Sequence, residues 1–146
     1  MNKFFLLLLS VIFFTGCASI DKNLLLDKGT KVEIIDVSKD PIISSDVTND
    51  YGSLSRRIMG YTKDELGKLN IEASTYKIYG AAKLKYDIKN FSKGIFKYTV
   101  KYKVTLETTD GKIIFIDNED KDDSDIDVIF ERMANRTAKF VSKSFK

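Results

Sequence analysis

The sequence of 146 residues contains no histidine, no tryptophan, one cysteine and one proline. Histidine is the commonest general base and transition-metal ligand, so its absence weighs against the enzymes and metal sites that depend on it. A single cysteine excludes a disulfide within the chain. The sequence also has no phosphate-binding glycine loop and no nucleophile motif. We therefore expect a non-enzymatic protein, with no catalytic residue, no cofactor and no metal ion.

The composition is that of one folded domain. Hydrophobic residues make up 43% of the chain and charged residues 31%, which is ordinary for a globular protein. The formal net charge is +3 at pH 7. A charge this small does not indicate a nucleic-acid partner, and we expect none.

The N-terminus has the pattern of a secretory signal peptide. Met1–Lys3 carries one positive charge, and an apolar run follows from Phe4 to Phe14. This run is too short for a membrane-spanning helix, which needs about 20 residues. A short apolar core behind a positive start is typical of a signal peptide.

The end of this leader, Phe14-Thr15-Gly16-Cys17, resembles the bacterial lipobox, in which small residues precede a cysteine. The resemblance implies that residues 1–16 are removed and that Cys17 receives the lipid that anchors the protein in a membrane. Phe14 departs from the usual leucine, and the alternative is an uncleaved apolar helix. Since Ala18-Ser19 follow, where an aspartate would retain the protein at the inner membrane, the resemblance implies a cell-envelope lipoprotein of the outer membrane.

Residues 17–30 are expected to form the lipidated cysteine and a tether, although Leu24–Leu26 could dock on the domain. The domain itself should span residues 31–146. A first strand is expected from Lys31 to Val37, and a long polar stretch from Ser38 to Gly52 follows. A helix should then run from Ser53 to about Leu69.

Period-two alternation gives the strongest structural signal in the sequence. Even-numbered positions are mostly apolar and odd-numbered ones mostly lysine or threonine from Tyr76 to Ile88 and from Phe96 to Glu107. This pattern predicts two strands, each with one buried and one wet face. Asn90–Gly94 is the expected hairpin turn, and Lys112–Asp117 the expected third strand of a meander.

The chain should close on a helix from about Asp125 to Phe145, with apolar residues at helical spacing and basic residues along its later turns. The predicted fold is α+β, in the order strand, helix, three-stranded meander, helix. The sheet should be rich in antiparallel pairs, with both helices on its apolar face.

That order behind a lipobox resembles a group of outer-membrane accessory lipoproteins, which includes activators of penicillin-binding proteins and the periplasmic domain of the curli secretion lipoprotein. The matching features are the first strand, the first helix, and the segments IYGAAKLKYDI and YKVTLETTDGKIIF. The resemblance assigns no functional residue to this chain.

The candidate binding surface is the wet face of the two alternating strands. The alternation predicts a register that puts Lys83 opposite Lys101, and like charges facing each other cost stability. An anionic partner would relieve that repulsion; otherwise the lysines only keep the sheet face solvated. The expected contact residues are Tyr79, Lys83, Lys85, Lys101 and Lys103.

Two further charged clusters each allow two interpretations. The acidic run over residues 117–127 is either a calcium site or a solvated loop that caps the last helix, and the EF-hand spacing is absent. The basic stripe of the last helix could extend the lysine field or touch anionic lipid, and it could equally be an ordinary solvated face.

These observations predict a membrane-anchored envelope lipoprotein that acts as a binding or assembly accessory protein. Its expected partners are the membrane, through the lipid, and an envelope protein, lipopolysaccharide or peptidoglycan. The alternative is a lipoprotein displayed on the cell surface as an antigen or adhesin.

The anchoring hypothesis predicts that Cys17→Ala blocks lipidation and leaves an unprocessed precursor, because the thiol that receives the lipid is gone. Immunoblotting of membrane fractions washed in high salt measures this. A variant still cut at the same bond and still membrane-bound would show that the lipobox assignment is wrong.

Overall fold

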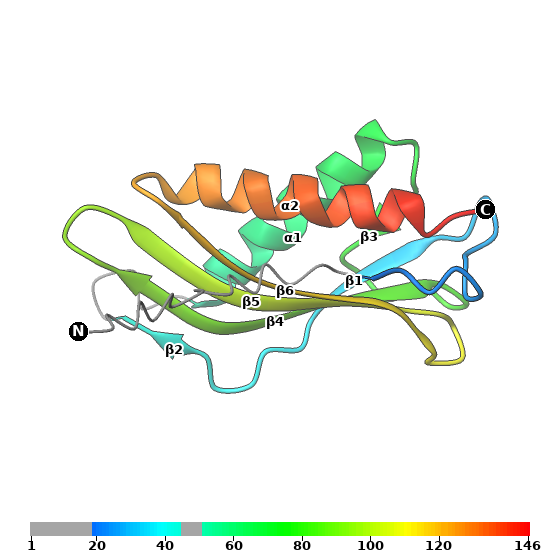
Figure 1. Cartoon of the computed structure of the whole chain (residues 1–146), viewed down its shortest axis with the longest axis horizontal. Helices are drawn as coiled ribbons and strands as arrows, with labels where there is room; N and C mark the ends of the chain where they lie inside the picture. The colour runs from blue at the N-terminus through cyan, green and yellow to red at the C-terminus, as the bar shows by residue number, and fades with distance from the viewer. Residues whose placement is uncertain (1–18, 45–50) are drawn as a thin grey trace, which may run out of the picture.

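The computed structural model describes residues 19–44 and 51–146, so the signal peptide and Cys17 lie outside the described residues (Figure 1). The fold is α+β, as predicted. No helix in the described ranges is long and apolar enough to cross a membrane. The elements in chain order are β1 (Val32–Asp36), β2 (Ile42–Ile43), α1 (Tyr51–Lys68), β3 (Ala73–Ser74), β4 (Ala82–Lys93), β5 (Tyr98–Glu107), β6 (Ile113–Asp123) and α2 (Ile126–Lys143).

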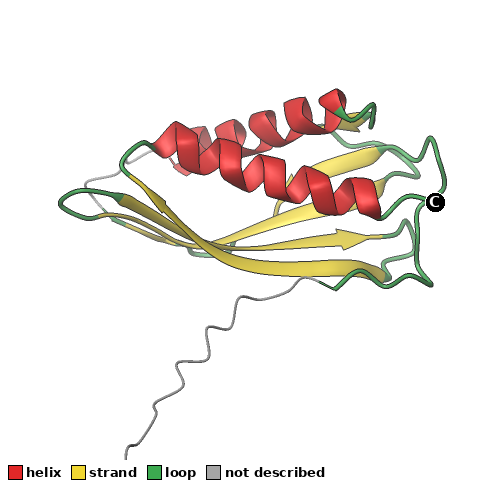
Figure 2. Ribbon diagram, turned by 45° about the horizontal axis from the view of Figure 1, so that its top comes forward, coloured by secondary structure: helices red, strands yellow, loops and turns green. Residues whose placement is uncertain are grey.

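The molecule has two layers, with one mixed sheet covered on one face by both helices (Figure 2). The main strand order is β3-β1-β4-β5-β6, and β2 pairs with β4 beyond the end of β1. The meander β4-β5-β6 is antiparallel, whereas β1 runs parallel to both of its neighbours. The first helix packs on β1 and β3, and α2 packs on β5 and β6.

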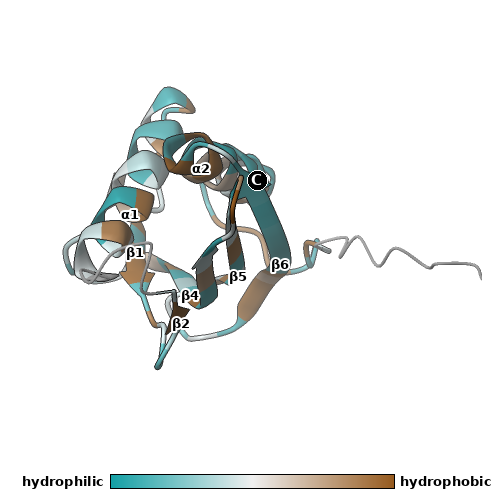
Figure 3. Ribbon diagram, turned by 90° about the vertical axis from the view of Figure 1, so that its left-hand side faces the viewer, coloured by the Kyte–Doolittle hydropathy of each residue, from teal (hydrophilic) through white to brown (hydrophobic). Residues whose placement is uncertain are grey.

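The core lies between the two layers, which Figure 3 shows end-on. Alternate residues of β4, such as Leu84 and Tyr86, are buried against the helices, while Lys83 on the other face is exposed. One-sided burial of this kind is what the period-two alternation predicted. In the described part of the chain, every fully buried residue of the core cluster lies between Leu26 and Val141.

The strand that the alternation predicted from Tyr76 onward begins later than expected. Gly80 has a positive φ of 74° and sits in a turn closed by a hydrogen bond from the Ala81 N–H to the Ile78 carbonyl. Strand β4 therefore starts at Ala82, where it pairs with Val32 of β1. The alternation from Tyr76 onward belongs to a turn and then a strand, because a left-handed glycine interrupts the extended backbone.

The hairpin turn and the register are also displaced. Strand β4 runs through the predicted turn to Lys93, and the actual turn is Gly94–Lys97. The alternating pattern keeps the apolar side chains on the buried face in several registers. The sequence alone therefore did not determine which residues of the two strands lie opposite each other. A bulge between Ile88 and Asn90 shifts the pairing by a further residue.

The acidic run is not a loop. Strand β6 extends to Asp123, so most of the acidic side chains of residues 117–127 lie on a strand beside the lysine-rich β5. Lys101 faces Asp120 in that pairing, and opposite charges across a strand pair favour the extended form. The capping prediction is confirmed, since the Asp125 side chain accepts a hydrogen bond from the Asp127 N–H at the start of α2.

The segment expected to be a tether is packed on the domain from Ile20 onward. Ile20 forms an antiparallel bridge with Phe115 of β6. Leu26 is 5% exposed, and its N–H donates to the Ser144 carbonyl at 2.7 Å. Of the two possibilities that the sequence left open for Leu24–Leu26, the structure shows docking on the domain.

One-sided burial predicts unequal costs for substitutions in the sheet. Leu84→Asp or Val100→Asp places an unpaired charge in the core and should lower the free energy of unfolding by several kcal/mol. Lys101→Gln on the wet face should cost less than about 1 kcal/mol, because its exposed ion pair with Asp120 contributes little. Urea unfolding measures both, and equal losses would show that the sheet is covered on both faces.

Candidate functional site

The four predicted contact lysines share the open face of the sheet, and the predicted aromatic residue does not. Lys83 and Lys85 of β4 and Lys101 and Lys103 of β5 all lie on the face away from the helices. Tyr79 precedes the strand, in the turn that ends at Gly80, and is 89% exposed with Lys77 over its ring. The structure thus brings together four of the five residues.

The repulsion that motivated this site is absent. Lys83 faces Glu107, and Lys101 faces Asn90 rather than Lys83. Lys85 Nζ lies 2.6 Å from Glu107 Oε2, and Lys101 Nζ lies 3.6 Å from an oxygen of Asp120. The expected like-charge pair was wrong because the register is displaced, and acidic side chains of β5 and β6 neutralise much of this face.

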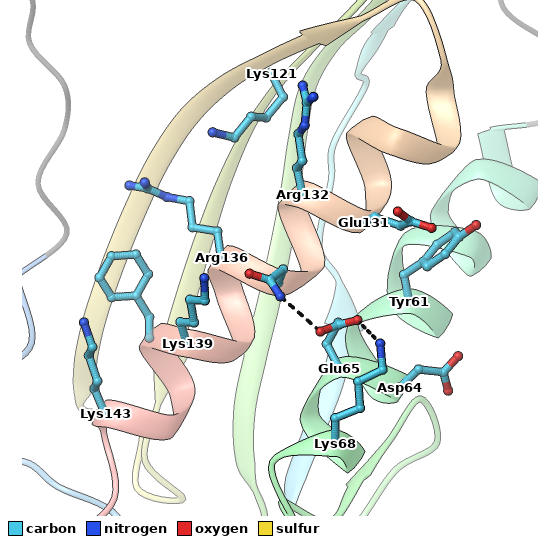
Figure 4. Close-up of a pocket in the computed structure, with 12 residues that line it drawn as sticks. Tyr61, Asp64, Glu65, Lys68, Lys121, Glu131, Arg132, Arg136, Lys139 and Lys143 are labelled. Atoms are coloured by element: carbon cyan, nitrogen blue, oxygen red, sulfur yellow. Dashed lines mark hydrogen bonds and ion pairs between the residues drawn. The ribbon is translucent and has the colours of Figure 1, made fainter.

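A second charged surface lies on the helix layer. A groove of about 850 Å³ runs along α2, between α1 on one side and β6 on the other (Figure 4). Its lining residues are Tyr61, Asp64, Glu65, Lys68, Lys121, Glu131, Arg132, Asn135, Arg136, Lys139, Phe140 and Lys143. Four cations of α2, namely Arg132, Arg136, Lys139 and Lys143, form what we call the α2 basic stripe. Their spacing of three or four residues places them on one side of the helix.

The two arginines of the stripe are committed to partners inside the protein. Arg136 makes two hydrogen bonds to Asp117, from Nε at 2.7 Å and from Nη2 at 2.9 Å, and Asp117 is only 1% exposed. The hydrogen bonds with this carboxylate hold the pKa of Arg136 above its usual range. Arg132 pairs with Asp123 at 2.9 Å. Both arginines therefore join α2 to β6.

The two lysines of the stripe are not committed in this way. Lys139 and Lys143 are exposed and make no ion pair within the ranges that the structure describes. Lys143 Nζ lies 6.0 Å from the centroid of the Phe140 ring, which packs against Phe115 at 5.6 Å. Among the cations that line the groove, the two without an ion pair in the described residues thus lie in the last turns of α2.

Two groups on the α1 side of the groove, Glu65 and Tyr61, are hydrogen-bonded within the protein, whereas the exposed carboxylate of Asp64 makes no ion pair among the described residues. Glu65 accepts hydrogen bonds from Lys68 and from Asn135, and these bonds, led by that of Lys68, lower the pKa of its carboxyl. Tyr61 donates to Asp127 at 3.1 Å, and this hydrogen bond is the main reason why the pKa of Tyr61 is raised. Glu65 and Tyr61 are therefore each held by partners on α1 and α2.

The tip of the β4–β5 hairpin exposes two large apolar side chains. Ile95 is 91% exposed and Phe96 is 86% exposed, within the turn from Gly94 to Lys97. The alternation had placed Phe96 on the buried face, and that prediction was wrong because the turn falls there. Gly94, next to two adjacent apolar residues, is the local signal that could have located this tip.

The calcium interpretation gains no support from the geometry. No group of three or more acidic or cysteine side chains that could hold a metal ion occurs among the residues described. The acidic side chains of β6 alternate in direction along the strand and pair with lysines and arginines.

No protein-family model matches the chain, and no curated protein matches it in sequence. Its fold is similar to that of PelC from Paraburkholderia phytofirmans. A dodecamer of PelC has 10% identity and a TM-score of 0.54 over 89% of this chain and 98% of that one. A dodecamer of a single-residue variant gives 9% identity, with the same TM-score and coverage. At this identity the likeness establishes the fold alone.

The geometry predicts that the two arginines of the stripe contribute unequally to the free energy of unfolding. Arg136→Gln leaves Asp117 buried without a counter-charge and should lower the free energy of unfolding by about 3 kcal/mol. Arg132→Gln removes a more exposed pair and should cost less than about 1 kcal/mol. Urea unfolding curves compare them, and equal costs would mean that Asp117 does not depend on Arg136.

Proposed function

We propose that this protein is a membrane-anchored envelope lipoprotein that acts as a non-enzymatic binding or assembly accessory protein. The observation that carries this proposal is the exposed apolar tip of the β4–β5 hairpin, Ile95 and Phe96. Neither side chain is among the buried core residues or the partly buried residues that pack against them. Their burial requires a surface outside the domain.

The tip is suited to a protein contact. Burying a large apolar side chain is worth about 1.5–3 kcal/mol, so two of them can anchor an interface. Aromatic and large aliphatic residues at the centre of an interface, with charged residues at the rim, are typical of binding hot spots. Lys93 and Lys97 flank the tip and supply such a rim.

Two further observations support an envelope accessory role. The lipobox resemblance at Cys17 implies export and a lipid anchor. The fold is that of PelC, whose structure is a dodecamer, so a domain of this architecture can serve as a subunit of an assembly. Another subunit, including a second copy of this chain, is the partner that we propose for the hairpin tip.

The alternative function, a surface antigen or adhesin, differs in the direction that the domain faces. A domain displayed outside the cell is digested when intact cells are treated with protease, whereas a periplasmic domain is protected. We expect protection, with digestion only after the outer membrane is opened.

Photo-cross-linking in cells tests where the partner binds. A photoreactive residue at Phe96 should give a defined cross-linked product, because the tip is buried in the complex. A photoreactive residue in place of Lys83 probes the open sheet face. A photoreactive residue in place of Asp110, in the exposed β5–β6 turn, serves as a control. Products are compared on denaturing gels and identified by mass spectrometry.

A double variant of the tip, with the photoreactive residue moved to the flanking Lys93, separates binding from folding. Ile95→Ser with Phe96→Ser should leave the thermal midpoint unchanged, since both side chains are exposed, and should abolish the cross-linked product from position 93. Cross-links from Lys83 but not from Phe96 would assign the partner to the sheet face. Absence of products from both positions would contradict the proposed binding function.

A further inference from the structure

We propose that Lys139 and Lys143 of the α2 basic stripe bind the phosphate headgroups of anionic lipids in the membrane that holds the lipid anchor. This would seat the groove that runs along α2 on the membrane surface. The membrane part of this proposal rests on the lipidation of Cys17. The binding itself depends only on residues that the structure describes.

The first support is the distribution of free charge. Of the cations that line the groove, Lys68, Lys121, Arg132 and Arg136 are paired with carboxylates of the protein. Lys139 and Lys143 are left without an ion pair in the described part of the chain, in the last turns of α2. The two lining carboxylates that also lack one there, Asp64 and Glu131, lie on α1 and in the first half of α2. Exposed lysines near an anionic bilayer are attracted to its negative surface potential.

The second support is the composition of the surface around these lysines. Phe140 lies between these two lysines in the sequence, and its side chain is half-buried. Arg136 Cζ lies 5.2 Å and Lys143 Nζ 6.0 Å from the centroid of its ring. A partly exposed aromatic ring flanked by cations suits the boundary between headgroups and acyl chains. In Figure 4 the side chains of Arg136 and Lys143 extend from α2 on the side away from α1.

The third support is the place where the N-terminal segment leaves the domain. Ile20 forms a β-bridge with Phe115 of β6, and the Phe115 ring packs against Phe140 of the groove. Ile20 follows Cys17 by three positions, so the chain can extend no more than about 11 Å between them. A lipid on Cys17 would therefore hold this side of the domain, with its two free lysines, close to the bilayer.

Vesicle binding by the chain from Ala18 to Lys146 tests the proposal without the lipid. This chain retains the whole described core, which begins at Leu26, and should fold on its own. We expect it to co-sediment with vesicles of phosphatidylcholine and phosphatidylglycerol and not with phosphatidylcholine alone. Binding should weaken as salt is added, because exposed charges are screened beyond about 10 Å at 0.1 M ionic strength.

Lys139→Gln with Lys143→Gln should weaken binding to the anionic vesicles by about 25-fold at low salt, on the basis of about fivefold for each lysine near the surface. The control, Lys63→Gln with Lys83→Gln, removes the same charge from exposed lysines that also lack an ion pair in the described ranges. It should bind as the wild type does. Both variants should keep the wild-type thermal midpoint.

Three results would overturn the inference. One is no preference for anionic vesicles, and another is equal loss in the two variants, which would reduce the effect to net charge. The third is release by inorganic phosphate but not by chloride at equal ionic strength, which would indicate a soluble anion as the ligand. None of these results bears on Cys17→Ala, so lipid anchoring can stand or fall separately.

Discussion

The buried carboxylate of Asp117 sets the position of the last helix. It is 1% exposed, so its charge has to be balanced from within the protein, and the Arg136 guanidinium does so through two hydrogen bonds. This pair connects the middle of β6 to the middle of α2 and fixes how the helix is rotated on the sheet. With Arg136 turned toward β6, Phe140 falls on Phe115, and Lys139 and Lys143 are left on the solvent side.

The same pairing logic distinguishes the two lysine-rich surfaces. On the sheet face, acidic residues of neighbouring strands stand opposite or beside the lysines, as Glu107 does for Lys83 and Lys85. On α2, the acidic residues of β6 reach the arginines and not the last two lysines. Charge density along the sequence is similar in both places, and the difference in free charge comes from which carboxylates lie within reach.

The proposed contacts lie at different parts of the molecule. The hairpin tip is beyond the pair of Tyr98 with Asp123, whereas the N-terminal segment meets β6 at Phe115. These points are eight residues apart along β6, or about 26 Å. The hairpin projects at the end of the molecule opposite the C-terminus (Figure 1), so a domain seated on a membrane through α2 would leave the apolar tip accessible to a partner.

The sequence by itself determined that β4 and β5 are strands buried on one face and that α2 is amphipathic, because both are local periodicities of the chain. The same periodicity could not determine register, since sliding one alternating strand by two residues keeps every apolar side chain inward. Only the tertiary structure decided it, through the pairing of Val32 with Ala82, fifty residues away, and the left-handed turn at Gly80. The register in turn determined that the sheet face is neutralised, that the hairpin tip is exposed and that most of the acidic run lies on a strand. Each of these depends on contacts between segments distant in sequence, which no local pattern encodes.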